Sequence, residues 1–151
     1  MVAFGNYLEQ LCNDLAASMQ RMGVNMSVQS IVADLPASTA LPLALIANEL
    51  VTNAFKHGCA AGATLIEVRL EDKGEALMLS VCDNGTGINR LDINAEITET
   101  SPQTKSLGFR LIEMLSRQID ATLTLPQSEN PPKFTVIVPK PKKSTGKALS
   151  S

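Results

Sequence analysis

The sequence predicts an α/β two-layer sandwich, in which helices cover one face of a mixed, mostly antiparallel sheet. Apolar residues recur at helical spacing in three segments and alternate with polar ones in several shorter segments. Two of the short segments are joined by a glycine-containing hairpin loop, which a strict strand–helix alternation would not give. We expect one domain over residues 1–138 and a disordered tail over 139–151.

The composition of the chain excludes several classes of function. The chain has 151 residues and a formal net charge of −2, and only 3% of its residues are aromatic. Neither the charge nor the aromatic content suits a nucleic-acid binder. No segment has the length and apolar character of a signal peptide or a membrane span, so no direct membrane contact is expected. The three cysteines have no CxxC spacing, which indicates reduced thiols and a cytoplasmic location, compatible with a membrane-anchored parent protein.

The first third of the chain is predicted to hold a helix, a strand and a turn. An apolar face runs through 7–22, and Gly23 follows it as a helix terminator. Residues 24–32 alternate loosely and are predicted to form a strand. Residues 34–40 contain Pro36 and a Ser-Thr pair, which is typical of a turn.

The central helix is predicted over 41–58. Pro42 suits a first helical turn, because the amide hydrogen that proline lacks would be unpaired there. Gly58 follows a Lys56-His57 pair and is expected to end the helix. The apolar stripe predicted to face the core consists of Leu43, Ile46, Ala47, Leu50 and Ala54.

The remaining elements are predicted in the second half of the chain. Strands over 64–70 and 76–82 flank a hairpin loop in which Gly74 supplies the bend. The polar segment 89–105 is predicted to be a mobile loop. A helix over 106–119 and strands over 121–125 and 133–138 complete the domain.

The first chemical cluster lies on the central helix. Glu49, Asn53, Lys56 and His57 recur at three- and four-residue spacing, which places an acid, an amide and a cation on neighbouring turns. Such groups can converge on a phosphate–Mg²⁺ assembly, because Mg²⁺ prefers oxygen ligands and keeps several waters. On spacing alone, a solvated helix face with cations near its C-terminus is the simpler explanation of the same pattern.

The second cluster is the stretch from Asp83 to Gly87, which follows a predicted strand. A carboxylate facing a pocket can accept a hydrogen bond from an adenine amino group. Gly85 and Gly87 would let the backbone approach a ligand closely. The alternative is an ordinary Asn-Gly turn. A calcium loop fits poorly, because the downstream acidic ligands are missing.

The third cluster is the predicted helix start at Ser106, Leu107 and Gly108. Helix N-termini present unpaired amide groups that suit phosphates, although Ser106 is also an ordinary N-cap residue. The chain has no Walker motif and no GxGxxG, which excludes P-loop and Rossmann sites. Too few Cys and His residues are present for a zinc site.

Taken together, ELVTNAFKH, DNGTGI and SLGFRLI resemble the N, G1 and G2 boxes of an ATPase superfamily. Gyrase B, MutL, heat-shock chaperones and sensor histidine kinases share these boxes. The spacing of Glu and Asn is most similar to bacterial histidine kinases related to the HWE group, whose Trp-x-Glu is not found here. The resemblance implies the Bergerat α/β sandwich and the binding of ATP with Mg²⁺.

The resemblance also implies roles for individual residues. Asn53 matches the Mg²⁺-binding asparagine, and Glu49 matches the catalytic or positioning carboxylate. Lys56 and His57 match positions that face the phosphates. The remaining implied nucleotide-binding residues are Asp83 for adenine reading, Gly85 and Gly87 for the shape of its pocket, and Ser106, Leu107 and Gly108 at the hinge of an ATP lid over 89–105.

The implied function is that of a histidine kinase catalytic domain, which transfers the γ-phosphoryl group of ATP to a histidine on a separate dimerisation domain. A response regulator then receives it. His57 is the one histidine in the chain and lies in the ATP-site helix, so the acceptor is expected elsewhere and the chain alone should not label itself. Two other functions remain open, a stand-alone serine kinase that binds a sigma factor and an interaction module that has lost ATP.

Overall fold

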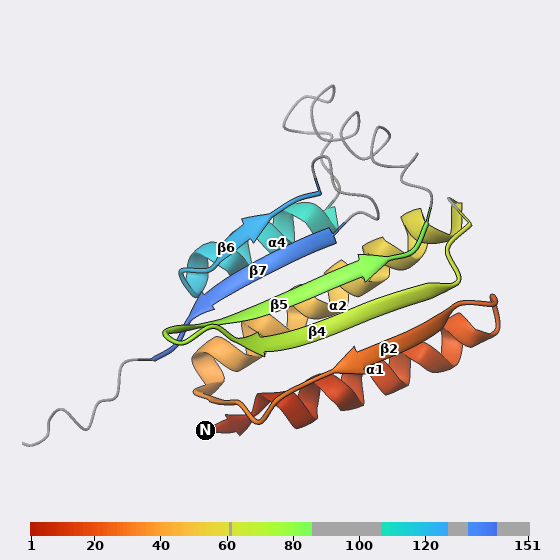
Figure 1. Cartoon of the computed structure of the whole chain (residues 1–151). Coiled ribbons are helices and arrows are strands. Elements are labelled where there is room, and N and C mark those ends of the chain that lie inside the picture. Colours follow the sequence, from red (N-terminus) through yellow and green to blue (C-terminus); the bar gives the residue numbers. More distant parts are fainter. Residues whose placement is uncertain (61, 86–106, 127–132, 142–151) are drawn as a thin grey trace, which may run out of the picture.

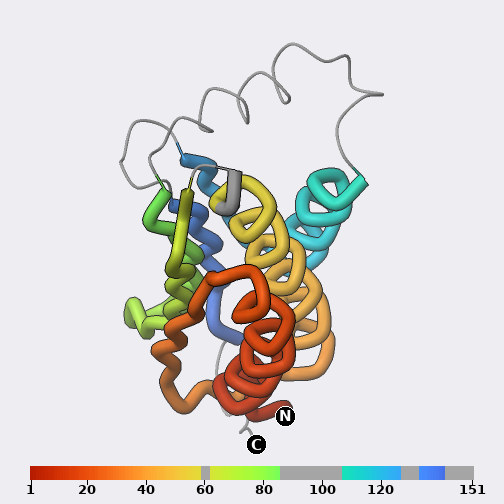
Figure 2. Tube along the Cα trace, turned by 90° about the vertical axis from the view of Figure 1, so that its right-hand side faces the viewer, coloured from red at the N-terminus to blue at the C-terminus, as the bar shows by residue number. Residues whose placement is uncertain are grey.

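Helices and strands form two layers in the computed structural model, which describes residues 1–60, 62–85, 107–126 and 133–141. The described helices are α1 (Phe4–Gln20), α2 (Ala37–Ala60) and α4 (Leu107–Gln118). All three lie on one face of the sheet (Figures 1 and 2). The described strands are β1 (Val2–Ala3), β2 (Asn25–Gln29), β3 (Asp34–Leu35), β4 (Leu65–Asp72), β5 (Ala76–Asp83), β6 (Thr122–Thr124) and β7 (Lys133–Pro139).

The main sheet of the described part has the strand order β2-β4-β5-β7-β6. β2 pairs in parallel with β4, and the other neighbours pair antiparallel. The predicted hairpin is confirmed, since Gly74 has a φ of +92° and donates its amide to the Asp72 carboxylate at 2.8 Å. The mixed, mostly antiparallel α/β sandwich predicted from the sequence is therefore the observed fold.

The core lies between the sheet and the helix layer and is almost entirely aliphatic. The stripe predicted on the central helix is buried as expected. From the sheet, Ile66, Val68, Leu79, Val81 and Val136 meet it without exposure to solvent. This alternation on β4, β5 and β7 directs every second residue to the helices, as period-two patterning requires.

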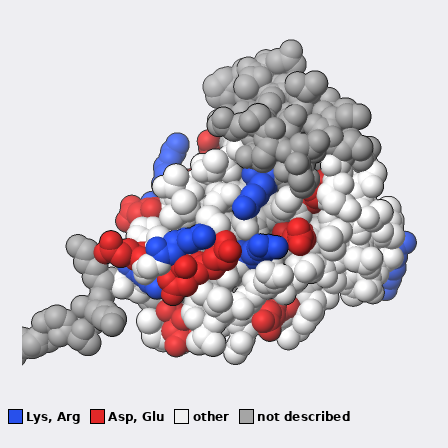
Figure 3. Space-filling model, in the orientation of Figure 1, with Lys and Arg blue, Asp and Glu red and all other residues white. Residues whose placement is uncertain are grey.

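The other face of the sheet carries charges of both signs (Figure 3). Pairs between neighbouring groups include Glu67 with Arg69 at 3.9 Å and Asp72 with Lys140 at 2.7 Å. Positive and negative side chains alternate on this face of the described residues. It therefore offers no concentration of one charge for a ligand such as a triphosphate.

Both boundaries of the central helix differ from the sequence prediction. The helix predicted over 41–58 begins at Ala37 and continues to Ala60, so Pro42 lies inside it and Gly58 does not end it. Pro36 initiates the helix instead, because its carbonyl accepts the amides of Thr39 and Ala40 at 2.9 and 2.8 Å.

The N-terminal region also holds more structure than the sequence predicted. Residues 34–35, predicted as part of a turn, form β3, which pairs antiparallel with β1. The Phe4 amide continues this pairing by donating to the Ala33 carbonyl at 2.8 Å. α1 therefore begins three residues before the predicted Tyr7 and buries Phe4 completely. β2 is correspondingly shorter than the predicted strand.

At the C-terminus β7 ends one residue beyond the predicted Val138. Pro139 pairs with Ala76, and the Lys140 amide donates to the Glu75 carbonyl at 2.9 Å. The rest of the predicted tail, from residue 142 onward, lies outside the described residues. Among the described residues, no helix combines the length and the apolar character that crossing a bilayer requires.

Candidate nucleotide site

One flank of α2 carries most of the predicted chemistry. Glu49, Asn53 and His57 recur every four residues, so they lie one above another beside the buried stripe. All three side chains are half-buried. Lys56 lies about 100° around the helix from His57 and is exposed. The structure therefore brings three of the four residues of this cluster into one row and separates Lys56 from it.

The start of α4 packs against the N-terminal end of this row. A side chain at Gly108 would meet the Oε1 atom of Glu49 and lie 3.4 Å from its Cδ atom. Glycine at this position therefore lets the α4 backbone approach the Glu49 carboxylate, and a larger residue would collide with that side chain. The neighbouring Leu107 is 82% exposed, so its side chain points away from the body of the domain.

Asp83 closes the other end of the row from the last position of β5. Its side chain is only 6% exposed, and its Oδ1 atom accepts the Gly85 amide at 2.7 Å. Burial raises the pKa of this carboxyl group, while the Gly85 amide and the nearby His57 act in the opposite direction. A buried carboxylate of this kind suits a ligand that donates a hydrogen bond, because the donor replaces the lost water.

Gly58 is the point of contact between Asp83 and α2. A Cβ atom at Gly58 would lie 3.2 Å from Asp83 Cγ and 3.3 Å from Asp83 Cβ. Glu49 and Gly58 are nine residues apart, or roughly 13 Å along the helix axis. The end of β5 and the start of α4 thus contact the C-terminal half of α2 about half a turn apart around its axis, and Asn53 lies between the two contacts along that axis.

Asn84 is a site residue that sequence reasoning treated only as part of a turn. Its Oδ1 atom accepts the amides of Thr64 and Leu65 at 2.8 and 3.0 Å, and its Nδ2 atom donates to Thr64 Oγ1 at 3.1 Å. These bonds fasten the end of β5 to the start of β4 and so fix the backbone that carries Asp83. An asparagine after a strand was the available signal, since its amide readily replaces backbone partners.

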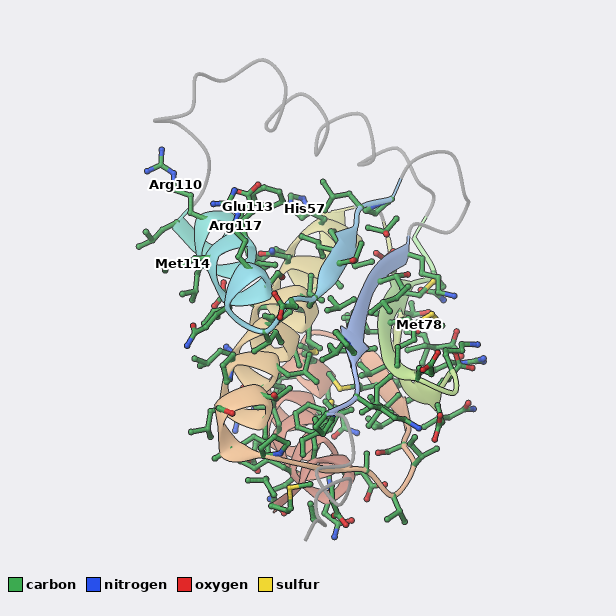
Figure 4. The ribbon with its side chains drawn as sticks, turned by 90° about the vertical axis from the view of Figure 1, so that its left-hand side faces the viewer. His57, Met78, Arg110, Glu113, Met114 and Arg117 are labelled. Carbon is green, nitrogen blue, oxygen red and sulfur yellow. The ribbon has the colours of Figure 1, made fainter. Side chains whose placement is uncertain are left out.

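Two charged side chains of α4 were also not singled out from the sequence. Arg110 and Glu113 lie at the same end of the molecule as His57 (Figure 4). Glu113 is half-buried, and Arg110 is exposed. Arg110 and Glu113 are three residues apart, so helical spacing alone would have placed them on one face of the helix that follows the predicted lid.

Some predicted site residues lie outside the described residues. These are Gly87, Ser106 and the predicted lid over 89–105. Among the residues that the structure does describe, no group of three or more His, Cys, Asp or Glu side chains is placed to hold a metal ion. Mg²⁺ binding through Asn53 therefore stays a prediction. The chemistry of the residues present fits a nucleotide, because the buried Asp83 carboxylate can accept a hydrogen bond from a base and the start of α4 lies beside the Glu49 carboxylate, with a glycine at each contact with α2.

Comparisons with known proteins identify the family and the fold. Among curated proteins the chain is similar to blue-light-activated histidine kinase 2 of Erythrobacter litoralis, with 27% identity over 127 residues. The match covers 83% of this chain but spans about a third of that relative, 35% of its length.

Solved structures share the fold. The histidine kinase domain of the Erythrobacter litoralis EL346 blue-light-activated kinase matches 92% of this chain and 62% of its own, with a TM-score of 0.76 and 24% identity. Full-length ShkA, solved in complex with AMPPNP, matches 92% of this chain and 30% of its own, with a TM-score of 0.68 and 17% identity. The sequence also matches the family described as "Histidine kinase-like ATPase domain" over residues 9–127. With that match over most of its length, the chain belongs to the histidine kinase-like ATPase domain family.

Proposed function

We propose that this domain binds ATP with Mg²⁺ and donates the γ-phosphoryl group to a histidine on a separate dimerisation domain, in cis or in trans. A response regulator would receive the phosphoryl group afterwards. The observation that carries the proposal is the buried Asp83 carboxylate, oriented by the Gly85 amide and packed against Gly58 near the C-terminal end of α2. Family membership supports ATP chemistry in general, and the proposal adds the acceptor and the residue roles.

In this proposal the adenine end of the nucleotide lies at Asp83. The carboxylate accepts a hydrogen bond from the exocyclic amino group, a donor that guanine does not present at the equivalent position. Gly85 and Gly87 keep side chains away from the base. The Asp83–Gly85 bond holds the carboxylate before ligand arrives, so little ordering is needed on binding.

The phosphate end lies along α2 towards Glu49. Asn53 would hold Mg²⁺ through its side-chain oxygen, since Mg²⁺ prefers oxygen ligands. Glu49 acts as the catalytic carboxylate that orients or deprotonates the attacking imidazole. Lys56 and His57 contribute to the charge around the phosphates. Ser106, Leu107 and Gly108 present the amide groups of the α4 start to them.

The reaction itself is a phosphoryl transfer. An imidazole nitrogen of the acceptor forms a bond to the γ-phosphorus while the bond to the bridging oxygen of ADP breaks, and the diphosphate leaves as ADP. A Mg²⁺ ion held by Asn53 would supply positive charge beside the phosphates. The acceptor histidine is supplied from outside this chain, because its single histidine lies in the site helix. A cytoplasmic location follows from the need for ATP and a response regulator.

A calorimetric nucleotide titration with and without Mg²⁺ tests the binding step. Asn53→Ala should remove the increase in ATP affinity that Mg²⁺ gives, while Asn48→Ala, on the same helix but outside the row, should retain it. Asp83→Asn should weaken ATP binding about 10- to 150-fold, the value of a hydrogen bond to a charged group. Asp14→Asn on the exposed face of α1 is the matched control. Wild-type affinity in both site variants would contradict the proposal.

A labelling experiment tests the transfer step. The domain is incubated with γ-labelled ATP, alone and with a histidine-bearing dimerisation domain from a histidine kinase of the same family. We expect an acid-labile label on the dimerisation domain and none on this chain. An acid-stable label on an added protein would indicate hydroxyl phosphorylation and favour the serine kinase function. A label on His57 would contradict the proposal directly.

A further inference from the structure

Gly58 stands in a place where a glycine is unexpected. It lies within α2, two residues before the helix ends at Ala60, and it is buried. Glycine is among the least favourable residues in a helix. The described glycines with positive φ are Gly23, Gly62 and Gly74, so the backbone at Gly58 does not need the conformational freedom of glycine. The reason for Gly58 must therefore be space.

The space that Gly58 leaves is taken by Asp83. A Cβ atom at position 58 would lie 3.2 Å from Asp83 Cγ, 3.3 Å from Asp83 Cβ and 3.0 Å from the Cβ of Ala63. Comfortable contacts between carbon atoms begin at about 3.5 Å. A methyl group here would push the Asp83 carboxyl group by a few tenths of an ångström. The Gly85 amide already fixes that group from the other side at 2.7 Å.

We infer that Gly58 is a positioning residue for base recognition. Because it has no side chain, the Asp83 carboxylate can pack directly against α2. The inference rests on the proposed function and adds a specificity residue to it. Gly58 touches Asp83 rather than the nucleotide. Its contribution is the alignment of the carboxylate with the exocyclic amino group of adenine, and hence the discrimination of ATP from GTP.

The direct test is Gly58→Ala, measured as ATP and GTP affinities beside thermal unfolding. A displaced carboxylate keeps part of its hydrogen bond, so we expect ATP affinity to fall about five- to tenfold and GTP affinity to change less than twofold. The melting temperature should change little, because the helical preference for alanine offsets the cost of the tight contacts at this position. If Gly58 were only structural, Gly58→Ala would lower the melting temperature and leave the selectivity between ATP and GTP unchanged.

A double-mutant cycle links the effect to Asp83. In an Asp83→Asn background the charged hydrogen bond is already lost, so Gly58→Ala should cause less than a twofold further change. A second variant addresses the contact with Ala63. Ala63→Gly relieves the 3.0 Å contact but not those to Asp83, so adding it to Gly58→Ala should leave the nucleotide defect in place. Restored ATP affinity in that pair, or additive losses in the cycle, would overturn the inference.

A nucleotide-free measurement separates this inference from the proposed function. The amide proton of Gly85 reports its hydrogen bond to Asp83, so its NMR chemical shift should move in Gly58→Ala without any ligand. If the wild type binds no ATP but the shift moves, the proposed function fails while the positioning contact stands. If the wild type binds ATP and Gly58→Ala behaves identically in affinity, selectivity and Gly85 shift, the inference fails alone.

Discussion

Asn84 offers a quantitative test of how the site is attached to the sheet. Asn84→Ala removes three hydrogen bonds, two from the amides of Thr64 and Leu65 and one to Thr64 Oγ1. All are exposed, so water can replace the lost partners, and each bond contributes near the lower end of the usual range. Their sum is about 2 kcal/mol. Scaled to the roughly 110 residues that the structure describes, this loss lowers the melting temperature by about 8 °C.

The assay is thermal and urea unfolding of Asn84→Ala, with Thr64→Val as the matched control. The valine variant loses only the hydroxyl partner and should cost less than about 1 kcal/mol. The double variant should be less destabilised than the sum of the two, because both remove the same hydroxyl–amide bond. ATP affinity should fall in Asn84→Ala, since Asn84 lies between Asp83 and Gly85. A loss below about 0.5 kcal/mol would refute the reasoning that this side chain holds the end of β5.

Three further substitutions test other features. Asp83→Asn should raise the melting temperature at pH 8, since burial raises the pKa of Asp83 above its unfolded value and its ionisation therefore costs stability. That gain should shrink as the pH falls through the raised pKa, whereas a gain independent of pH would contradict the cause assigned. Gly108→Ala should leave stability unchanged but slow phosphoryl transfer about tenfold, because the methyl group displaces the flexible Glu49 carboxylate; wild-type transfer rates would count against this. Ser116→Ala should raise the free energy of unfolding by about 0.5–1 kcal/mol in urea, because among the described residues the buried Ser116 Oγ has no hydrogen-bond partner; a destabilised variant would show otherwise.

Patterns within single elements accounted for most of the fold. The apolar stripe of α2 and the Gly74 hairpin depend on helical spacing and turn chemistry, which are local properties. Choosing between Pro36 and Pro42 as the helix start was not possible in this way, because both prolines satisfy the same local preference. Tertiary contacts decided it, since the pairing of β1 with β3 leads the chain directly into the helix.

In the candidate site, too, local features could be predicted from the sequence and tertiary contacts could not. The row of Glu49, Asn53 and His57 could be predicted because residues four apart share a helix face. The contact of Gly58 with Asp83 could not, because it joins positions 25 residues apart through packing. A glycine after Lys-His suggested a helix end, and only the folded chain shows that space for a carboxylate was the stronger requirement.

The position of β7 has a consequence for the protein during its synthesis. β7 is late in the sequence, yet it lies inside the sheet, between β5 and β6. A nascent chain that has emerged only as far as β6 therefore lacks β7, the strand that pairs β6 with the β4–β5 hairpin. Until residues 133–139 leave the ribosome, β6 and the outer edge of β5 have no strand to pair with, and α4 is held to the rest of the domain only by its packing against α2. A truncated translation product would accordingly present the unpaired backbone groups of the β5 edge, which favour aggregation with other strands.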